Sequence, residues 1–224
     1  MTETATFNLW TESWIMVETT TGAIETVGIE ALLLDAGRYR ALYDPSPLVV
    51  VAIHRLLTAI LQDVIRPARK HDLVVLWQGD TFPREPIQAF GRAYAPRFDI
   101  FSADAPLLQS ADIPREPEKR GQGKSVGYLL EELTAGTGVT HYNHLYEDDL
   151  CLCAACCARG LLSIPAFASS GGAGIKPSIN GVPPIYVLPG GETLYYSLIA
   201  SLTTPAYQPK AADRERDAPW WRRD

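Results

Sequence analysis

The pattern of apolar and polar positions changes from a strand period to a helical period within the first forty residues. Residues 7–17 are rich in aromatic and β-branched side chains, 20–22 (Thr-Thr-Gly) are typical of a turn, and 24–27 are again β-branched. This arrangement predicts a β-hairpin. Residues 29–34 then predict a short helix that ends at a C′ glycine, Gly37.

The strongest helical pattern follows the sequence Asp44-Pro45-Ser46-Pro47, which supplies an N-cap and a first-turn proline. The helix should stop before Pro67. Its spacing predicts a buried stripe of aliphatic side chains: Val49, Ile53, Leu56, Leu57, Ile60 and Val64. His54 lies beside this stripe, and we expect a hydrogen-bonded core or boundary residue rather than a metal ligand.

The remaining elements follow from the same two periods. We expect a helix around Ile87, Phe90 and Tyr94 that ends at Pro96, and then extended chain at 98–101, a short amphipathic helix at 128–133, a β-type run at 183–189 and a helix at 193–202. Polar loops are predicted at 112–124 and 137–149. The adjacent Trp220 and Trp221 need a covering surface, so the chain should continue or dock there.

Length and composition restrict the class of protein. A chain of 224 residues with 46% hydrophobic content can bury a core, as one large domain or two small ones. The longest apolar stretch, 47–65, is interrupted by polar and charged residues, and the N-terminus lacks the layout of a secretory signal. We therefore expect a soluble, cytoplasmic protein with no membrane partner.

The charge balance argues against bulk electrostatic binding of nucleic acid. The net charge is −6, whereas coating a polyanion requires clustered lysine and arginine. Any nucleic-acid contact should be local. Three basic clusters are candidates, although each alone is more often a solvated surface: Arg66, Arg69 and Lys70; Arg115, Lys119, Arg120 and Lys124; Arg222 and Arg223.

All four cysteines lie within seven residues. Cys153 and Cys156 have the two-residue spacing that lets two thiolates bind one tetrahedral zinc ion, so they predict half of a zinc site. His141 and His144 could supply further ligands, but the short spacer makes a closed local site less favourable. In a reducing compartment, disulfides are the less favoured alternative.

Catalytic patterns are weak. The sequence has no phosphate-binding loop ending in Gly-Lys-Ser/Thr and no His-Glu-x-x-His. A pairing of Cys151 with His144 rests only on proximity in sequence. We therefore expect a protein that is not an enzyme and has no thiol of low pKa or unusual reactivity.

Several segments, in order and spacing, resemble the CasA family, the large subunit of the type I-E CRISPR Cascade complex. The segment 7–17 is similar to the family's N-terminal signature, and 98–109 is similar to its acidic-aromatic segment. The Cys-x-x-Cys of 152–156, the glycine-rich 167–176 and the strand-helix run 186–202 resemble its next elements. The resemblance implies a loop-rich α+β domain with a small β-sheet and packed helices. Residues 1–224 would form part of the N-terminal domain, without the second Cys-x-x-Cys and the C-terminal four-helix bundle.

The resemblance also implies a function. Such a subunit is non-catalytic, contacts the 5′ end of the crRNA and other Cascade subunits, recognises the protospacer-adjacent motif (PAM) of double-stranded target DNA, and helps recruit the helicase-nuclease. The DNA-contacting glycine loop would comprise Ser170, Gly171, Gly172, Ala173, Gly174 and Lys176, and the loop contacting the complex would carry Tyr142 and Asn143. The alternative from another class is a zinc-supported scaffold that makes protein contacts only.

Overall fold

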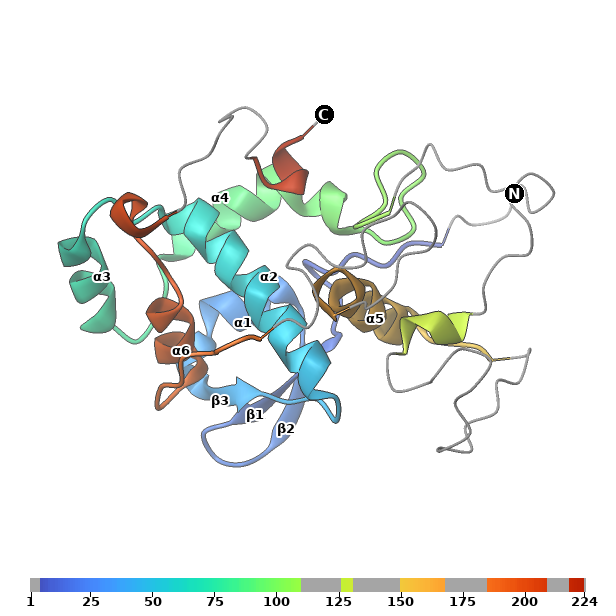
Figure 1. Cartoon of the computed structure of the whole chain (residues 1–224), viewed down its shortest axis with the longest axis horizontal. Helices are drawn as coiled ribbons and strands as arrows, with labels where there is room; N and C mark the ends of the chain where they lie inside the picture. Colours follow the sequence, from blue (N-terminus) through green and yellow to red (C-terminus); the bar gives the residue numbers. More distant parts are fainter. Residues whose placement is uncertain (1–4, 110–125, 131–149, 168–184, 209–217, 224) are drawn as a thin grey trace.

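The structure, a computed structural model, describes residues 5–109, 126–130, 150–167, 185–208 and 218–223 (Figure 1). A small antiparallel sheet lies on one side of the molecule, and helices cover it and extend away from it. The loops predicted at 112–124 and 137–149 lie outside the described residues. The mixed α+β fold class predicted from the sequence is confirmed.

The sheet contains three strands in the order β2-β1-β3: β1 (Ile15–Thr19), β2 (Ile24–Val27) and β3 (Tyr39–Leu42). The β1–β2 hairpin pairs Ile15 with Val27 and turns at Gly22, whose φ of 86° favours glycine. The predicted hairpin is therefore confirmed, but its first strand begins at Ile15 rather than near Phe7. The preceding residues instead bury Trp10 and Trp14 in the core.

Helix α1 (Ile29–Leu34) was predicted correctly, but its predicted stop was wrong. Asp35 is the C-cap, and its backbone N–H donates to the Ala31 carbonyl at 3.1 Å. Gly37 lies in the following 3-10 turn, η1 (Ala36–Arg38), with no positive φ. Glycine is needed at this position for a different reason, because a Cβ would collide with the backbone carbonyl of Asp80.

Helix α2 (Pro47–Ile65) has Ser46 as its N-cap and Pro47 in its first turn, as predicted. It ends at Arg66, which has a left-handed backbone conformation with φ of 47°. Its buried residues are Ala52, Ile53, His54, Leu56, Leu57, Ile60 and Leu61. The predicted stripe is thus confirmed in its centre, while Val49 and Val64 at its ends are only partly buried.

By length and composition α2 is also the one helix among the described residues that could cross a membrane. Its apolar side is occupied by protein, since Ile53, Leu57 and Ile60 lie in the hydrophobic core. Its polar side carries Arg55, Gln62 and Asp63. These contacts are those of a core helix of a globular domain.

Two helices follow, of which only the second was predicted. Helix α3 (Lys70–Trp77) buries none of its residues, so no apolar stripe marks it in the sequence. Helix α4 (Arg84–Tyr94) buries Ile87 and Phe90, as predicted, and leads into the 3-10 turn η2 (Ala95–Phe98). Within the segment 98–101, the extended prediction holds only for Asp99, which forms an isolated bridge with Asn8.

The second half of the chain adds helices α5 (Ala154–Phe167) and α6 (Leu194–Ala200) and the 3-10 turns η4 (Val126–Leu129), η5 (Pro205–Tyr207) and η6 (Trp220–Arg222). The predicted helix at 193–202 corresponds to α6. Within 128–133 the described residues form the end of a 3-10 turn rather than an α-helix. The β-type run at 183–189 is wrong for its described part, because 185–189 belong to no strand.

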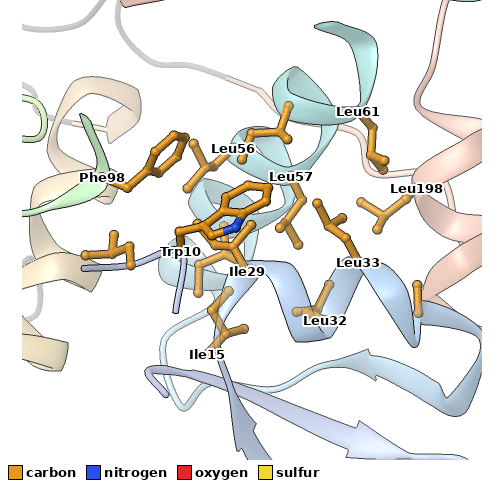
Figure 2. Close-up of a cluster of buried hydrophobic side chains, with 14 of the residues drawn as sticks. Trp10, Ile15, Ile29, Leu32, Leu33, Leu56, Leu57, Leu61, Phe98 and Leu198 are labelled. Atoms are coloured by element: carbon orange, nitrogen blue, oxygen red, sulfur yellow. The ribbon is translucent and has the colours of Figure 1, made fainter. Parts of the chain in front are cut away.

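The core lies where α1 and α2 meet the N-terminal segment and α6 (Figure 2). Trp10 sits in its centre between Ile29 and Phe98, and Leu198 closes it from α6. The last described turn also docks on this core. Trp221 is 3% exposed and contacts the rings of Phe90 and Phe98, with centroid distances of 5.7 and 5.9 Å.

Candidate nucleic-acid interface and thiol pair

Helix α5 lies between the two segments that carry the residues predicted to contact nucleic acid. The described chain enters α5 from Leu150 and leaves it after Phe167. Two groups of predicted residues lie outside the described residues, namely Tyr142 and Asn143, and Ser170, Gly171, Gly172, Ala173, Gly174 and Lys176. The structure does, however, define the flanks from which both segments depart.

A clamp centred on Tyr186 joins the two flanks of the 168–184 segment. The Tyr186 hydroxyl donates to the Ala166 carbonyl at 2.9 Å, and its ring contacts that of Phe167 at 5.0 Å. On the other side, Arg55 of α2 donates from Nη1 to the Tyr186 hydroxyl at 3.2 Å, and its guanidinium lies 4.9 Å from the ring centroid. The two ends of the glycine-rich segment are therefore held together against α2.

The Cys153–Cys156 pair lies at the N-terminal end of α5. Their Sγ atoms are 3.2 Å apart, and the backbone N–H of Cys156 donates to Cys153 Sγ at 3.4 Å. This backbone bond, with the adjacent thiol, lowers the pKa of Cys153 because it stabilises the thiolate. The hydrogen bond with Cys153, and then burial, raise the pKa of Cys156. The expectation that no cysteine has a lowered pKa is thus wrong for Cys153.

This pair has the form of half a zinc site. Two thiolates on a tetrahedral zinc ion lie about 3.8 Å apart, as follows from Zn–S bonds of about 2.3 Å, so a small opening of the pair would suffice. Cys157 is half-buried, and burial raises its pKa; Cys151 is exposed. Among the residues that the structure describes, no group of three or more possible ligands gathers. A closed four-ligand site built on this pair would therefore need two further ligands from outside it.

A nearly buried ion pair connects α5 to the start of α2. Arg159 Nη1 lies 3.1 Å from Asp44 Oδ2, and the two side chains are only 19% and 8% exposed. The other terminal nitrogen of Arg159 donates to Cys156 Sγ at 3.4 Å. The next residue, Gly160, has no room for a side chain, since a Cβ would lie 2.7 Å from Leu129 Cβ. These contacts fix α5, and with it the thiol pair, against η4 and against the segment that leads into α2.

A second carboxylate, Asp63 in the last turn of α2, gathers three donors. It accepts from Trp221 Nε1 at 2.8 Å, from Arg222 Nε at 2.7 Å and from Arg66 Nη2 at 2.7 Å. Burial alone would raise the pKa of Asp63, but these hydrogen bonds reverse the effect and lower it. Two basic clusters that the sequence presents 156 residues apart thus meet at one carboxylate. No local pattern in the sequence indicates this meeting.

Comparison with known proteins identifies the family. The model of the family described as CRISPR-associated protein Cse1 matches residues 8–224. The chain belongs to the Cse1 (CasA) family. The Cse1-family chain is 34% identical, over 222 residues, to the CRISPR-associated protein CasA/Cse1 of Thermus thermophilus, with 96% of this chain covered and 42% of the relative. It therefore spans less than half the length of that relative.

Solved structures of Cse1 proteins have the same fold. The Cse1 crystal structure from Acidimicrobium ferrooxidans matches with a TM-score of 0.78 at 28% identity, covering 98% of this chain and 43% of that one. A chain of a CRISPR RNA-guided surveillance complex in a pre-nicking state matches with a TM-score of 0.76 at 20% identity, covering 97% and 46%. The fold of the described Cse1-family chain is thus that of the N-terminal part of its relatives.

Proposed function

We propose that this Cse1-family chain is a non-catalytic, cytoplasmic component of a type I-E Cascade complex. In this role the glycine-rich segment, Ser170 to Gly174 with Lys176, recognises the PAM of double-stranded target DNA. Tyr142 and Asn143 contact the assembly near the 5′ end of the crRNA, and the assembled complex recruits the helicase-nuclease. Family membership over residues 8–224 is the observation that carries this proposal.

The clamp at Tyr186 supports the DNA-recognition part of the proposal. A segment rich in glycine loses much conformational entropy when it binds. Holding its two ends together, through Ala166 and Arg55, reduces the freedom that must be lost. Glycine without a Cβ also lets backbone N–H and C=O groups approach base edges in the minor groove, and Lys176 has the charge to hold a phosphate.

The test uses a reconstituted Cascade complex containing this chain. Gly172→Leu should weaken binding of target DNA that carries the preferred motif by about tenfold, because one lost groove contact costs about 1–3 kcal/mol, while assembly is unchanged. Gly190→Leu is the matched control, because Gly190 is exposed and a Cβ there meets no atom within 4 Å. Unchanged motif dependence in Gly172→Leu would contradict the proposal.

The thiol pair favours a second candidate function, a zinc-supported scaffold that makes protein contacts only. Cys153 and Cys156 would supply two ligands, and the other ligands would come from chain outside the described residues. Metal analysis of the purified protein and of Cys153→Ser, combined with a DNA titration over a range of salt, separates the candidates. A pure scaffold binds zinc and shows no motif preference at any ionic strength.

A further inference from the structure

A continuous groove runs along one side of α2, from the Tyr186 clamp to the arginines at its C-terminal end. It consists of two hollows, of about 510 Å³ beside Arg55 and Tyr186 and about 600 Å³ beside Arg66 and Arg222. Both hollows are lined by Ala59 and Gln62, so they adjoin. The groove therefore connects the base of the glycine-rich segment with the turn at Trp220–Arg222.

The groove is positively charged although the protein as a whole is acidic. Among the described residues that line it there are three guanidiniums, those of Arg55, Arg66 and Arg222, and one carboxylate, that of Asp63. The C-terminal end of α2 contributes only about half a negative charge, so positive charge remains in excess. Because the net charge of the whole chain is −6, this excess is a local feature rather than a general property of the surface.

Arg66 and Arg222, at the end of the groove away from Tyr186, have N–H groups that are not used in hydrogen bonds to described residues. Arg222 uses Nε for Asp63, and its two terminal nitrogens have no acceptor among the described residues. Arg66 donates from Nε to the backbone carbonyl of Asp63 and from Nη2 to its carboxylate, and the Arg66 side chain is 62% exposed. Planar guanidiniums with free N–H groups match phosphate oxygens well. A third hollow, of about 390 Å³, opens on the other side of the same two arginines.

The spacing along α2 suits a nucleic-acid backbone. Arg66, the C-cap residue of α2, follows Arg55 by eleven residues, which separates the two by about 16 Å along the helix axis, and both side chains line the groove. Successive phosphates of one strand advance about 3.4 Å along a duplex axis. Contacts at the two ends of the groove would therefore be about five base pairs apart on one strand.

We propose that this groove binds the phosphate backbone of a nucleic-acid duplex, with Arg66 and Arg222 contacting phosphates about five base pairs from those nearest Arg55. The contact is independent of sequence and holds the duplex in register while the glycine-rich segment reads it. The proposal goes beyond motif recognition, because it assigns a second, purely electrostatic site.

The test measures binding of the full 224-residue chain to a labelled 30-base-pair duplex by fluorescence anisotropy over a series of KCl concentrations. Arg66→Gln should lower affinity about three- to tenfold at low salt and reduce the slope of log K against log [KCl] by about one. Arg66→Lys should retain most of the slope. Arg40→Gln is the matched control, because Arg40 is 67% exposed, pairs with one carboxylate and lies on β3, on the opposite side of the molecule from the C-terminal turn (Figure 1). That variant should bind as the unmodified chain does.

Three outcomes would overturn the proposal: no duplex binding by the chain at low salt, equal slopes for Arg66→Gln and Arg40→Gln, or displacement of the duplex by polyglutamate as effectively as by unlabelled duplex at equal charge. The last result would identify an acidic protein surface as the ligand. Because the duplex is chosen without a motif, failure here leaves the motif-dependence test of Gly172→Leu unaffected, and the reverse also holds.

Discussion

Two nearly buried carboxylates lie at opposite ends of α2 and are neutralised differently. Asp44 precedes the helix, is 8% exposed and meets one guanidinium, that of Arg159, which is itself only 19% exposed. Asp63 lies in the last turn, is 7% exposed and meets two guanidiniums, which are 34% and 62% exposed. The two carboxylates are thus equally buried, but Asp44 belongs to a buried pair with one arginine, whereas Asp63 belongs to a more exposed cluster with two.

The helix itself explains part of this difference. The N-terminal end of α2 carries a partial positive charge, which already favours Asp44, whereas the C-terminal end carries a partial negative charge, which adds to that of Asp63. More cations are therefore needed at the second end to satisfy the buried acid. The two arginines at Asp63 remain 62% and 34% exposed, as the proposed contact with phosphates requires.

The largest effect is expected from breaking the closed pair. Asp44→Asn keeps an acceptor for the backbone N–H of Ser46 but leaves the Arg159 guanidinium without an opposing charge in a poorly hydrated position. We expect a loss of about 3 kcal/mol in the free energy of unfolding, measured by urea denaturation. Binding of duplex DNA by the folded variant should be unchanged. A loss below 1 kcal/mol would show that the pair behaves as a surface salt bridge.

Breaking the open cluster should cost less stability and, unlike Asp44→Asn, should change the binding of duplex DNA. Asp63→Asn retains an acceptor for Trp221, and Arg66 and Arg222 can turn to solvent, so we expect a loss of about 1–2 kcal/mol. Asp63 is the one carboxylate among the described residues of the groove, and its removal makes the net charge of the groove more positive by one. Affinity for duplex DNA should therefore rise, and a fall in the folded variant would contradict the proposed groove.

The sequence predicts this fold well where one side of an element is buried. The α2 stripe, α4 and α6 follow from helical spacing because their apolar residues meet a core. Helix α3 could not be predicted in this way, since it buries no residue and its apolar run has no helical period. The stop of α1 was predicted wrongly because Gly37 serves a close backbone contact with Asp80 rather than a left-handed cap.

The candidate sites were predictable only where the spacing is local. The Cys153–Cys156 pair follows from a two-residue spacer, and the structure brings the two Sγ atoms together. The sequence predicts that Trp221 needs a covering surface but not which surface covers it, because nothing near it in sequence identifies Asp63 as its partner. The arginine cluster and the Tyr186 clamp both join residues more than a hundred positions apart, and only tertiary structure can show them.

A third experiment isolates the backbone of Arg66 from its side chain. Arg66 has φ of 47°, a conformation that costs a residue with a Cβ about 1 kcal/mol relative to glycine. Arg66→Gly and Arg66→Ala both remove the guanidinium, so Arg66→Gly should be about 1 kcal/mol more stable than Arg66→Ala in thermal or urea unfolding. Both should bind duplex DNA equally weakly. Equal stability of the two would mean that the turn after α2 relaxes and that Arg66 is not held in place.

The smallest expected effect is the pH dependence of the open cluster. The pKa of Asp63 is lower in the folded chain than in the unfolded chain, so on acidification the unfolded state takes up the proton first. The stability that Asp63 contributes is complete above its ordinary pKa and is lost as the pH falls through the lowered value. Asp63→Asn lacks the titrating carboxyl group. The difference in free energy of unfolding between the unmodified chain and Asp63→Asn should therefore become smaller in acid, by no more than about 0.3 kcal/mol between pH 5 and pH 4. Urea denaturation of both proteins at each pH measures the difference, and a gap that widens on acidification would show that Asp63 is not held ionised by Arg66, Arg222 and Trp221.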